Sequence, residues 1–190
     1  MSVKILVPLA DGFEEIEAVA IIDVLRRAEL DVVTAGLEPG AVEGAHMIRI
    51  EPDAWIGEVD LDGVDAVVLP GGMPGTRALM ADERVLGLVQ RLAAEGRVTA
   101  AVCAAPLVLA EAGVISGKEI TSHPAVREEL SASDGEVVGA PRVIESGGVI
   151  TSQGPGTSIE FALALVTRLA SPEVAERLRE AMLVHAPPLR

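Results

Sequence analysis

The chain has 190 residues, of which 49% are hydrophobic but only 2% aromatic, and its formal net charge is -14. This length and composition allow one domain with a sizeable aliphatic core, so we expect a single domain over residues 1–190. The charge argues against binding to nucleic acid or to a membrane, and because we find neither a signal sequence nor an apolar run of roughly 18 to 20 residues, we expect a cytoplasmic protein.

Strand and helix patterns alternate along the first half of the chain. An apolar run at Val3–Leu9 predicts a buried first strand, and the pattern of Glu14–Ala28 predicts the first helix. The next expected elements are a strand at Asp31–Ala35, a less regular region over residues 37–64 with a short strand at Met47–Ile50, a strand at Asp65–Leu69 and a helix across Thr76–Ala94.

The same alternation continues in the second half, and the proline-rich tail Ala186–Arg190 is expected to fray. The expected elements are a strand at Val98–Val102, a helix at Ala104–Ala112, short strands at Glu119–Ser122, Glu136–Val138, Arg142–Glu145 and Val149–Thr151, and helices at Ser158–Leu169 and Pro172–Leu183. Strands that alternate with helices predict an α/β fold, with a mostly parallel sheet covered by helices on both faces.

Ligands of such sheets bind beyond the carboxyl ends of the strands. Three loops lie at those ends in the predicted order of elements: Ala10–Phe13, Pro70–Gly75 and Cys103–Pro106. We therefore expect the chemistry of the protein in these loops.

Cys103 is the only cysteine, which excludes an intramolecular disulfide, and it stands between a predicted strand and a predicted helix. Its alanine neighbours suit a tight turn, and Pro106 fits the first turn of a helix. At the positive end of a helix, the dipole and the free N–H groups favour a thiolate. The sequence therefore predicts a reactive thiol, and an inert core cysteine is the alternative.

Glu17 lies in the middle of the apolar stripe of the first predicted helix. At about 100° per residue, Phe13, Ala20, Ile21, Val24 and Ala28 fall within about 60° of it, whereas Glu15 and Arg26 lie on the opposite side. An ionised carboxylate is unfavourable on a buried face, so we expect a raised pKa and a neutral acid that donates a hydrogen bond. The acid should lie near Cys103 and stabilise its thiolate; the alternative is that Glu17 caps its own helix.

Two further features stand near these loops. The glycines of Pro70-Gly71-Gly72 could present backbone N–H groups to an oxyanion, together with the N–H of Ala104, although such a pair is more often only a turn. His123 is the best candidate for a general base among the three histidines, although it is more often only a loop residue. Thr157 and Glu160 predict a capping box, and the preceding Pro155-Gly156 could wall the pocket.

No cofactor motif stands out in the sequence. There is neither a dinucleotide fingerprint nor a phosphate-binding loop. One cysteine and three scattered histidines offer no metal-ligand spacing, so we expect no metal and no organic cofactor.

These residues together resemble the ThiJ/PfpI superfamily, in its branch with the parkinsonism-associated deglycase and the bacterial YajL protein. Five segments carry the resemblance in order along nearly the whole chain: Asp11–Glu17, Val68–Gly72, Ala101–Pro106, Thr121–Pro124 and Thr151–Thr157. The resemblance implies a flavodoxin-like three-layer sandwich and a homodimer. It implies Cys103 as nucleophile and Glu17 as its acid partner.

The resemblance also implies His123 as a third catalytic residue and the amides of Gly72 and Ala104 as oxyanion donors. It places Arg27 near a dimer interface and Gly71 and Pro155 at the pocket. Three positions depart from relatives. Ala104 replaces the histidine of the protease-like branch, which disfavours peptidase activity. His46 stands where some relatives carry an arginine, and Glu51 where the parkinsonism protein has a second cysteine.

The function that we expect is glutathione-independent conversion of 2-oxoaldehydes, methylglyoxal to lactate, together with removal of early glyoxal adducts from glycated side chains. Cys103 would form a hemithioacetal and Glu17 would move protons between the adjacent carbons. The alternative is an oxidative-stress sensor or chaperone that works through a Cys103 sulfinate. A third possibility is an inert scaffold.

Overall fold

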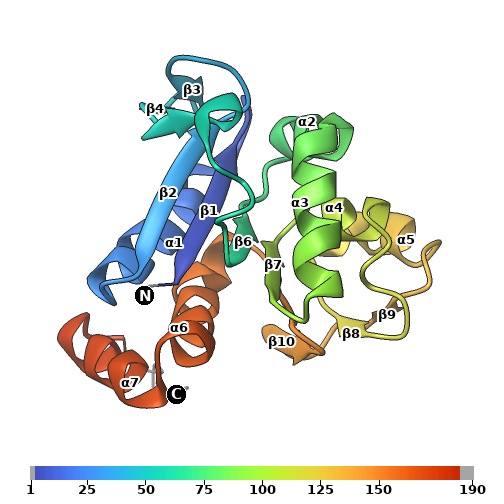
Figure 1. Cartoon of the computed structure of the whole chain (residues 1–190). Coiled ribbons are helices and arrows are strands. Elements are labelled where there is room, and N and C mark those ends of the chain that lie inside the picture. The colour runs from blue at the N-terminus through green and yellow to red at the C-terminus, as the bar shows by residue number, and fades with distance from the viewer. Residues whose placement is uncertain (1–2, 185–190) are drawn as a thin grey trace.

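The structure is a computed structural model, and it describes residues 3–184. A seven-stranded sheet forms its centre, in the order β10-β11-β7-β6-β1-β2-β5 (Figure 1). The strands are β1 (Lys4–Leu9), β2 (Asp31–Gly36), β5 (Ala54–Trp55), β6 (Ala66–Leu69), β7 (Val98–Val102), β10 (Val143–Ser146) and β11 (Val149–Ser152). Neighbouring strands run parallel except for β10, which is antiparallel to β11. The predicted mostly parallel sheet is confirmed.

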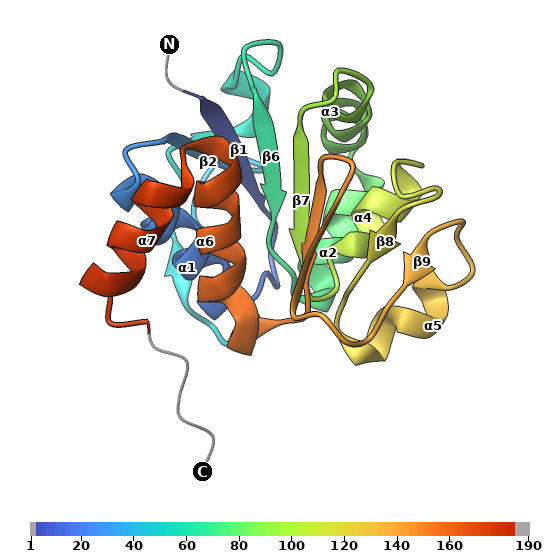
Figure 2. The ribbon, with the colours of Figure 1, turned by 90° about the horizontal axis from the view of Figure 1, so that it is seen from below.

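Helices cover both faces of this sheet, so the molecule has three layers (Figure 2). One face carries α1 (Glu15–Arg27), α6 (Ser158–Leu169) and α7 (Pro172–Ala181), and the other carries α2 (Met73–Ala81), α3 (Glu83–Ala94), α4 (Pro106–Glu111) and α5 (Arg127–Leu130). Side chains of β1 alternate between the two cores: Ile5, Val7 and Leu9 pack beneath α1, and Leu6 packs on the other side. This arrangement confirms the predicted flavodoxin-like α/β fold.

Two small sheets and three 3-10 turns lie outside the central sheet. The small sheets pair β3 (Val42–Glu43) with β4 (Arg49–Ile50) and β8 (Glu119–Ile120) with β9 (Glu136–Val137), and the turns are η1 (Ile56–Glu58), η2 (Pro124–Val126) and η3 (Pro155–Thr157). Among residues 3–184, no helix is long and apolar enough to cross a membrane. The predicted fraying of Ala186–Arg190 lies outside the described residues.

Some predicted boundaries were wrong. The helix expected over Thr76–Ala94 is two helices, because Asp82 adopts extended backbone angles and caps α3 by accepting hydrogen bonds from the amides of Arg84 and Val85. The strand expected at Met47–Ile50 has only two residues, since Met47 adopts a left-handed conformation with φ +67°. The helix that follows Cys103, α4, starts at Pro106, two residues later than the predicted start at Ala104.

The topology brings three loops to one edge of the sheet. In the sheet, β2 lies on one side of β1 and β6 lies on its other side. The order of the strands therefore reverses its direction between β1 and β6. In open parallel sheets, ligands bind at such a switch point, beyond the carboxyl ends of the strands. Gly71 and Cys103 lie in the loops that follow β6 and β7, and Glu17 lies in the first turn of α1, directly after the loop that follows β1.

Candidate active site

Cys103 occupies a tight turn between β7 and α4, and it is one of four non-glycine residues with positive φ among the described residues, at +63°. The backbone holds this turn from two sides. The Cys103 N–H donates to the Ser152 carbonyl oxygen at 3.0 Å, and the His123 N–H donates to the Cys103 carbonyl oxygen at 2.8 Å. The predicted strand-to-helix turn is confirmed, and the backbone of the partly buried Cys103 is held by β11 and by the loop that carries His123.

Gly71 allows this turn to approach α1 closely. A Cβ atom at Gly71 would lie 2.7 Å from the Cys103 Cβ and 2.7 Å from Glu17 Oε2. These separations are far below ordinary carbon contacts, so any side chain at Gly71 would push the two functional residues apart. The next residue, Gly72, has a positive φ of +94° and begins α2.

Glu17 is fully buried on the face of α1 that packs on the sheet, as its place in the apolar stripe predicted. Its Oε2 accepts a hydrogen bond from the Gly71 N–H at 2.7 Å. Its Oε1 is buried and has no partner of good hydrogen-bond geometry among the described residues. The Cys103 thiol lies beside this carboxyl, close enough that each group shifts the pKa of the other.

Burial raises the pKa of Glu17 to about 7. The Gly71 N–H and the Cys103 thiol act in the opposite direction, and the negative charge of Glu14 adds to the increase. The pKa therefore moves in the direction that the sequence predicted. A carboxyl group with this pKa can both hold and release a proton near neutral pH.

The thiol behaves differently from the prediction. Burial, followed by the charge of Glu17, raises the pKa of Cys103 to about 12. The N–H groups of Ala104 and Gly72 interact with the sulfur and oppose this increase, but they do not overcome it. The free N–H groups at this turn thus favour the thiolate, as the sequence predicted, but burial, which the prediction did not include, has the larger effect.

Two negative charges in one buried site repel each other, so Cys103 and Glu17 lose their protons in two separate steps. Between the two pKa values, near 7 and near 12, the pair holds a single proton. The amides of Gly72 and Ala104 face the sulfur, which is the place that the sequence predicted for oxyanion donors.

His123 lies across Gly154 from the thiol. A Cβ atom at Gly154 would lie 3.5 Å from the Cδ2 of the exposed His123 ring and 4.0 Å from the Cys103 sulfur. The His123 Nδ1 accepts a hydrogen bond from the Ala125 N–H at 3.2 Å, so a neutral ring carries its proton on Nε2. Among residues 3–184, no hydrogen bond joins this ring to Cys103. A role for His123 as a base stays a prediction.

The turn η3 before α6 follows Gly154 and begins at Pro155, whose place at a pocket stays a prediction. The predicted capping box there was wrong: Thr157 accepts a hydrogen bond from the Gly154 N–H and shares another with Ser152, whereas Glu160 pairs with Arg142. Thr157 thus stabilises the loop beside the thiol instead of the start of α6.

Arg27 and Glu51 are exposed and lie outside this pocket. Arg27 is in the last turn of α1, at the end away from Glu17, and pairs with Asp23 at 2.6 Å. Within one chain, Arg27 therefore does not reach Cys103. Its predicted place at a dimer interface stays a prediction.

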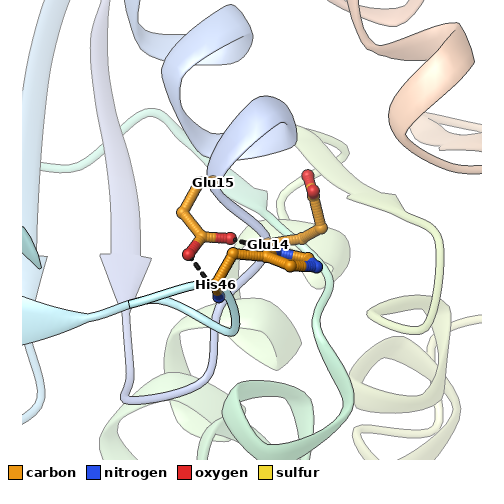
Figure 3. Close-up of side chains that lie close together, drawn as sticks. All are labelled: Glu14, Glu15 and His46. Carbon is orange, nitrogen blue, oxygen red and sulfur yellow. Dashed lines mark hydrogen bonds and ion pairs between the residues drawn. The ribbon is translucent and has the colours of Figure 1, made fainter. Parts of the chain in front are cut away.

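A second group of polar side chains lies beside the site, and the sequence did not reveal it. Glu15 is buried although it faces away from the stripe of Glu17, because the loop around His46 covers it (Figure 3). Glu15 accepts hydrogen bonds from the His46 N–H at 2.5 Å and from the ring Nδ1 at 2.9 Å. Gly44 is required there, since a side chain would collide with the Glu15 carboxyl group.

Ligand atoms of Glu14, Glu15 and His46 all lie within 4.8 Å of one another, the spacing of a possible metal site. The hydrogen bonds of the cluster already account for its geometry, because Glu15 binds the His46 ring and backbone and Glu14 accepts from the Glu17 N–H. These hydrogen bonds also shift the pKa values of both residues. Burial alone would raise the pKa of Glu15, but the hydrogen bonds from His46 lower it. The hydrogen bond from Glu15 raises the pKa of His46.

Comparison with known proteins places these residues in context. A family model described as the DJ-1/PfpI family matches residues 3–168. Protein dj-1beta of Drosophila melanogaster is 42% identical over 185 residues, which cover 97% of this chain and 98% of the relative. The glutathione-independent glyoxalase DJR-1.2 of Caenorhabditis elegans is 36% identical over 178 residues, with 93% of each chain covered.

Solved structures agree over the same length. The crystal structure of Drosophila melanogaster DJ-1beta gives a TM-score of 0.93 at 41% identity and covers 98% of this chain and 100% of the other. The structure of oxidized Toxoplasma gondii DJ-1 gives a TM-score of 0.90 at 36% identity, with 97% and 100% covered. The similarity therefore extends over nearly the whole chain.

Proposed function

Because the chain belongs to the DJ-1/PfpI family, we propose that it is a cysteine-dependent enzyme that converts 2-oxoaldehydes such as methylglyoxal to 2-hydroxy acids without glutathione. The observation that carries this proposal is the fully buried Glu17 carboxyl group beside the Cys103 thiol, a place where burial raises the pKa of both groups. Support also comes from the C. elegans relative, which is named a glutathione-independent glyoxalase. Removal of early glyoxal adducts from glycated side chains would use the same addition chemistry.

The reaction begins with addition of sulfur to the aldehyde. When the shared proton is on Glu17, the Cys103 thiolate attacks the aldehyde carbon of methylglyoxal and forms a carbon–sulfur bond. The carbonyl electron pair moves to oxygen, which faces the amides of Gly72 and Ala104 and then takes the proton from Glu17. The product of this step is a hemithioacetal, and Glu17 is left as a carboxylate.

The next steps move one proton between adjacent carbons. The Glu17 carboxylate removes the proton from the carbon that carries sulfur, and the neighbouring carbonyl oxygen takes up the hydroxyl proton of the sulfur-bearing carbon, so that the electron pair forms a carbon–carbon double bond. Glu17 then returns its proton to the neighbouring carbon, and the oxygen on the sulfur-bearing carbon becomes the thioester carbonyl. This produces a thioester of lactate, and water cleaves it to release lactate and the free thiol. No net oxidation occurs, so the cycle requires neither an electron carrier nor glutathione. The unpartnered Oε1 is the atom of Glu17 that is free for these transfers.

The test is lactate formation from methylglyoxal by the purified protein. We expect activity to be lost in Cys103→Ala and in Glu17→Gln, and to be retained in Glu83→Gln, a matched control that removes one exposed carboxylate from α3. Full activity of the Cys103→Ala protein would exclude the proposal.

A redox sensor or stress chaperone is the second candidate, and one observation favours it. The same groups that would hold an oxyanion, the Gly72 and Ala104 amides and a protonated Glu17, would also hold the oxygens of a Cys103 sulfinate. Mass spectrometry after mild peroxide would measure oxidation, while methylglyoxal turnover is followed in the same sample. Rapid sulfinate formation in a protein that has an intact thiol but no turnover would favour the sensor.

We also propose that the chain forms a homodimer through the surface of α1 and the adjoining loop. Ile16 and Val19 of α1 are 61% and 50% exposed, and Met47 and Ile48 of the loop are 81% and 55% exposed. Apolar side chains gathered in this way commonly mark a protein interface. Sedimentation analysis of Val19→Glu compared with the wild type tests this, and an unchanged dimer in the variant would locate the interface elsewhere.

A further inference from the structure

Glu14 stands at the start of α1, one turn before Glu17, and the catalytic scheme does not use it. The residue is only 8% exposed, which is unusual for a glutamate at the N-cap of a helix. Its Oε2 accepts a hydrogen bond from the Glu17 N–H at 2.7 Å, and its own N–H donates to the Gly71 carbonyl oxygen at 2.9 Å. Glu14 therefore binds the backbone of Glu17 and also Gly71, the residue whose N–H binds the Glu17 carboxyl group.

Three hydrogen bonds form a closed ring among these residues. The Glu14 N–H donates to Gly71, the Gly71 N–H donates to the Glu17 carboxyl at 2.7 Å, and the Glu17 N–H donates back to the Glu14 carboxyl. The ring joins the first turn of α1 to the loop after β6, across the switch point of the sheet. A change in any member alters the position of the Glu17 carboxyl relative to the Cys103 sulfur.

Glu14 also acts on this site through its charge. Burial is the main cause of the raised pKa of Glu17, and the negative charge of Glu14 adds to it. The other ionisable groups that face Glu14 are Glu15 and His46, which bind each other (Figure 3). The ionisable group that faces Glu17 from the loop after β7 is Cys103. Outside the reacting pair, Glu14 is thus the one group whose charge contributes to the raised pKa of Glu17.

We propose that Glu14 is a positioning residue of the Cys103–Glu17 pair, which holds Glu17 through its backbone N–H and, by its negative charge, keeps a proton on the pair. The inference rests on the proposed function only in taking Cys103 and Glu17 as the reacting pair. In the absence of this charge, the pair would lose its first proton at a lower pH. Glu14 therefore sets the lower edge of the pH range in which the thiol reacts.

The experiment measures the rate of Cys103 alkylation by iodoacetamide against pH, in the wild type and in Glu14→Gln, Glu14→Asp and Glu14→Ala. Glutamine keeps an oxygen that can accept the Glu17 N–H but removes the charge, and aspartate keeps the charge on a shorter chain. We expect the inflection near pH 7 to shift down by about half a unit to one unit in Glu14→Gln, which makes alkylation on the acid side about 3- to 10-fold faster. Glu14→Asp should keep the inflection of the wild type.

A role as a helix cap alone predicts a different result. In that case Glu14→Gln would alkylate with the pH profile of the wild type, and this outcome would overturn the proposal. Should Glu14→Gln fail to fold by circular dichroism, the comparison of Glu14→Ala with Glu14→Asp makes the same distinction, because only the first removes the charge. Glu83→Gln controls for the change in net charge.

Alkylation reports on the thiol itself, whether or not the protein turns over methylglyoxal. A shifted profile without lactate formation would therefore contradict the proposed function and leave the role of Glu14 intact. Lactate formation by a protein whose alkylation profile is unchanged in Glu14→Gln would support the proposed function and contradict the role of Glu14.

Discussion

Gly71→Ala is the substitution that tests the site geometry most directly. The backbone of Gly71 does not have the positive φ that excludes alanine, so the effect of the new methyl group is purely steric. It would lie 2.7 Å from the Cys103 Cβ, 2.7 Å from Glu17 Oε2 and 3.0 Å from the Val102 carbonyl oxygen. Carbon atoms pack at about 3.5 to 4.0 Å, so neighbours must move by about 1 Å.

Each way of relieving these contacts is unfavourable. Movement of the Cys103 turn displaces a fully packed core, which costs about 1 to 3 kcal/mol. Movement of the Glu17 carboxyl weakens its hydrogen bond with the Gly71 N–H, and a buried polar group without its partner costs about 1 to 3 kcal/mol. We expect Gly71→Ala to lower the free energy of unfolding by about 2 to 4 kcal/mol, and to slow both alkylation of Cys103 and methylglyoxal turnover.

Urea denaturation at pH 7 measures the change in stability, and iodoacetamide alkylation measures the change at the thiol. Gly87→Ala is the matched control, because Gly87 is exposed within α3 and a Cβ there would meet no atom within 4 Å. That variant should be more stable than the wild type by about 0.5 to 1 kcal/mol. A Gly71→Ala protein with the stability and the alkylation rate of the wild type would refute the close approach of the three residues.

Substitutions at three other positions test further parts of the structure. The raised pKa of Glu17 means that the folded state binds this proton more tightly than the unfolded chain, so stability should fall by up to about 3 kcal/mol as the pH rises from 4.5 to about 7. Glu17→Gln should lack this fall in urea denaturation at pH 5 and pH 8. Glu29 follows α1 in a left-handed conformation with a φ of +60°, which glycine adopts without strain. Glu29→Gly should therefore raise the melting temperature and increase the free energy of unfolding by about 0.5 to 1 kcal/mol, whereas Glu29→Ala should not. Equal melting temperatures of the two variants would contradict the left-handed cap. Because the pKa of His46 is raised in the folded state, its contact with Glu15 stabilises the fold below about pH 6.5, and this stabilisation is lost as the pH rises through the pKa of His46 in the folded protein. His46→Ala should therefore be less stable than the wild type at pH 5.5 but not at pH 9. A difference that is independent of pH would argue against this ion pair.

Local sequence patterns predicted the parts of the site that depend on local structure. The apolar runs of β1, β6 and β7 end at glycine, proline or cysteine, so the positions of their carboxyl ends were clear. Helical periodicity alone placed Glu17 on the buried face of α1. Because the carboxyl ends of parallel strands meet at one edge, the proximity of Cys103 and Glu17 followed from these two observations.

Features that depend on distant segments were missed. The burial of Glu15 results from a loop about 30 residues later in the chain, and no pattern within α1 indicates it. The break at Asp82 had a local signal, an aspartate able to cap α3, but apolar periodicity continues on both sides and concealed it. The strand β5 has two residues, too few for any periodicity.

The raised pKa of Cys103 shows what the local argument for a reactive thiol left out. A helix terminus was expected to favour the thiolate, but a six-residue helix and two amides cannot offset the burial that the sheet and α1 impose together. Reactivity must then come from a neighbour that accepts the proton, and Glu17 is the group placed to do so. On this view the same burial raises both pKa values and so keeps one proton on the pair between about pH 7 and pH 12. In the proposed mechanism the thiol reacts in that range because the proton can reside on either group, and Glu14, by its charge, would determine where the range begins.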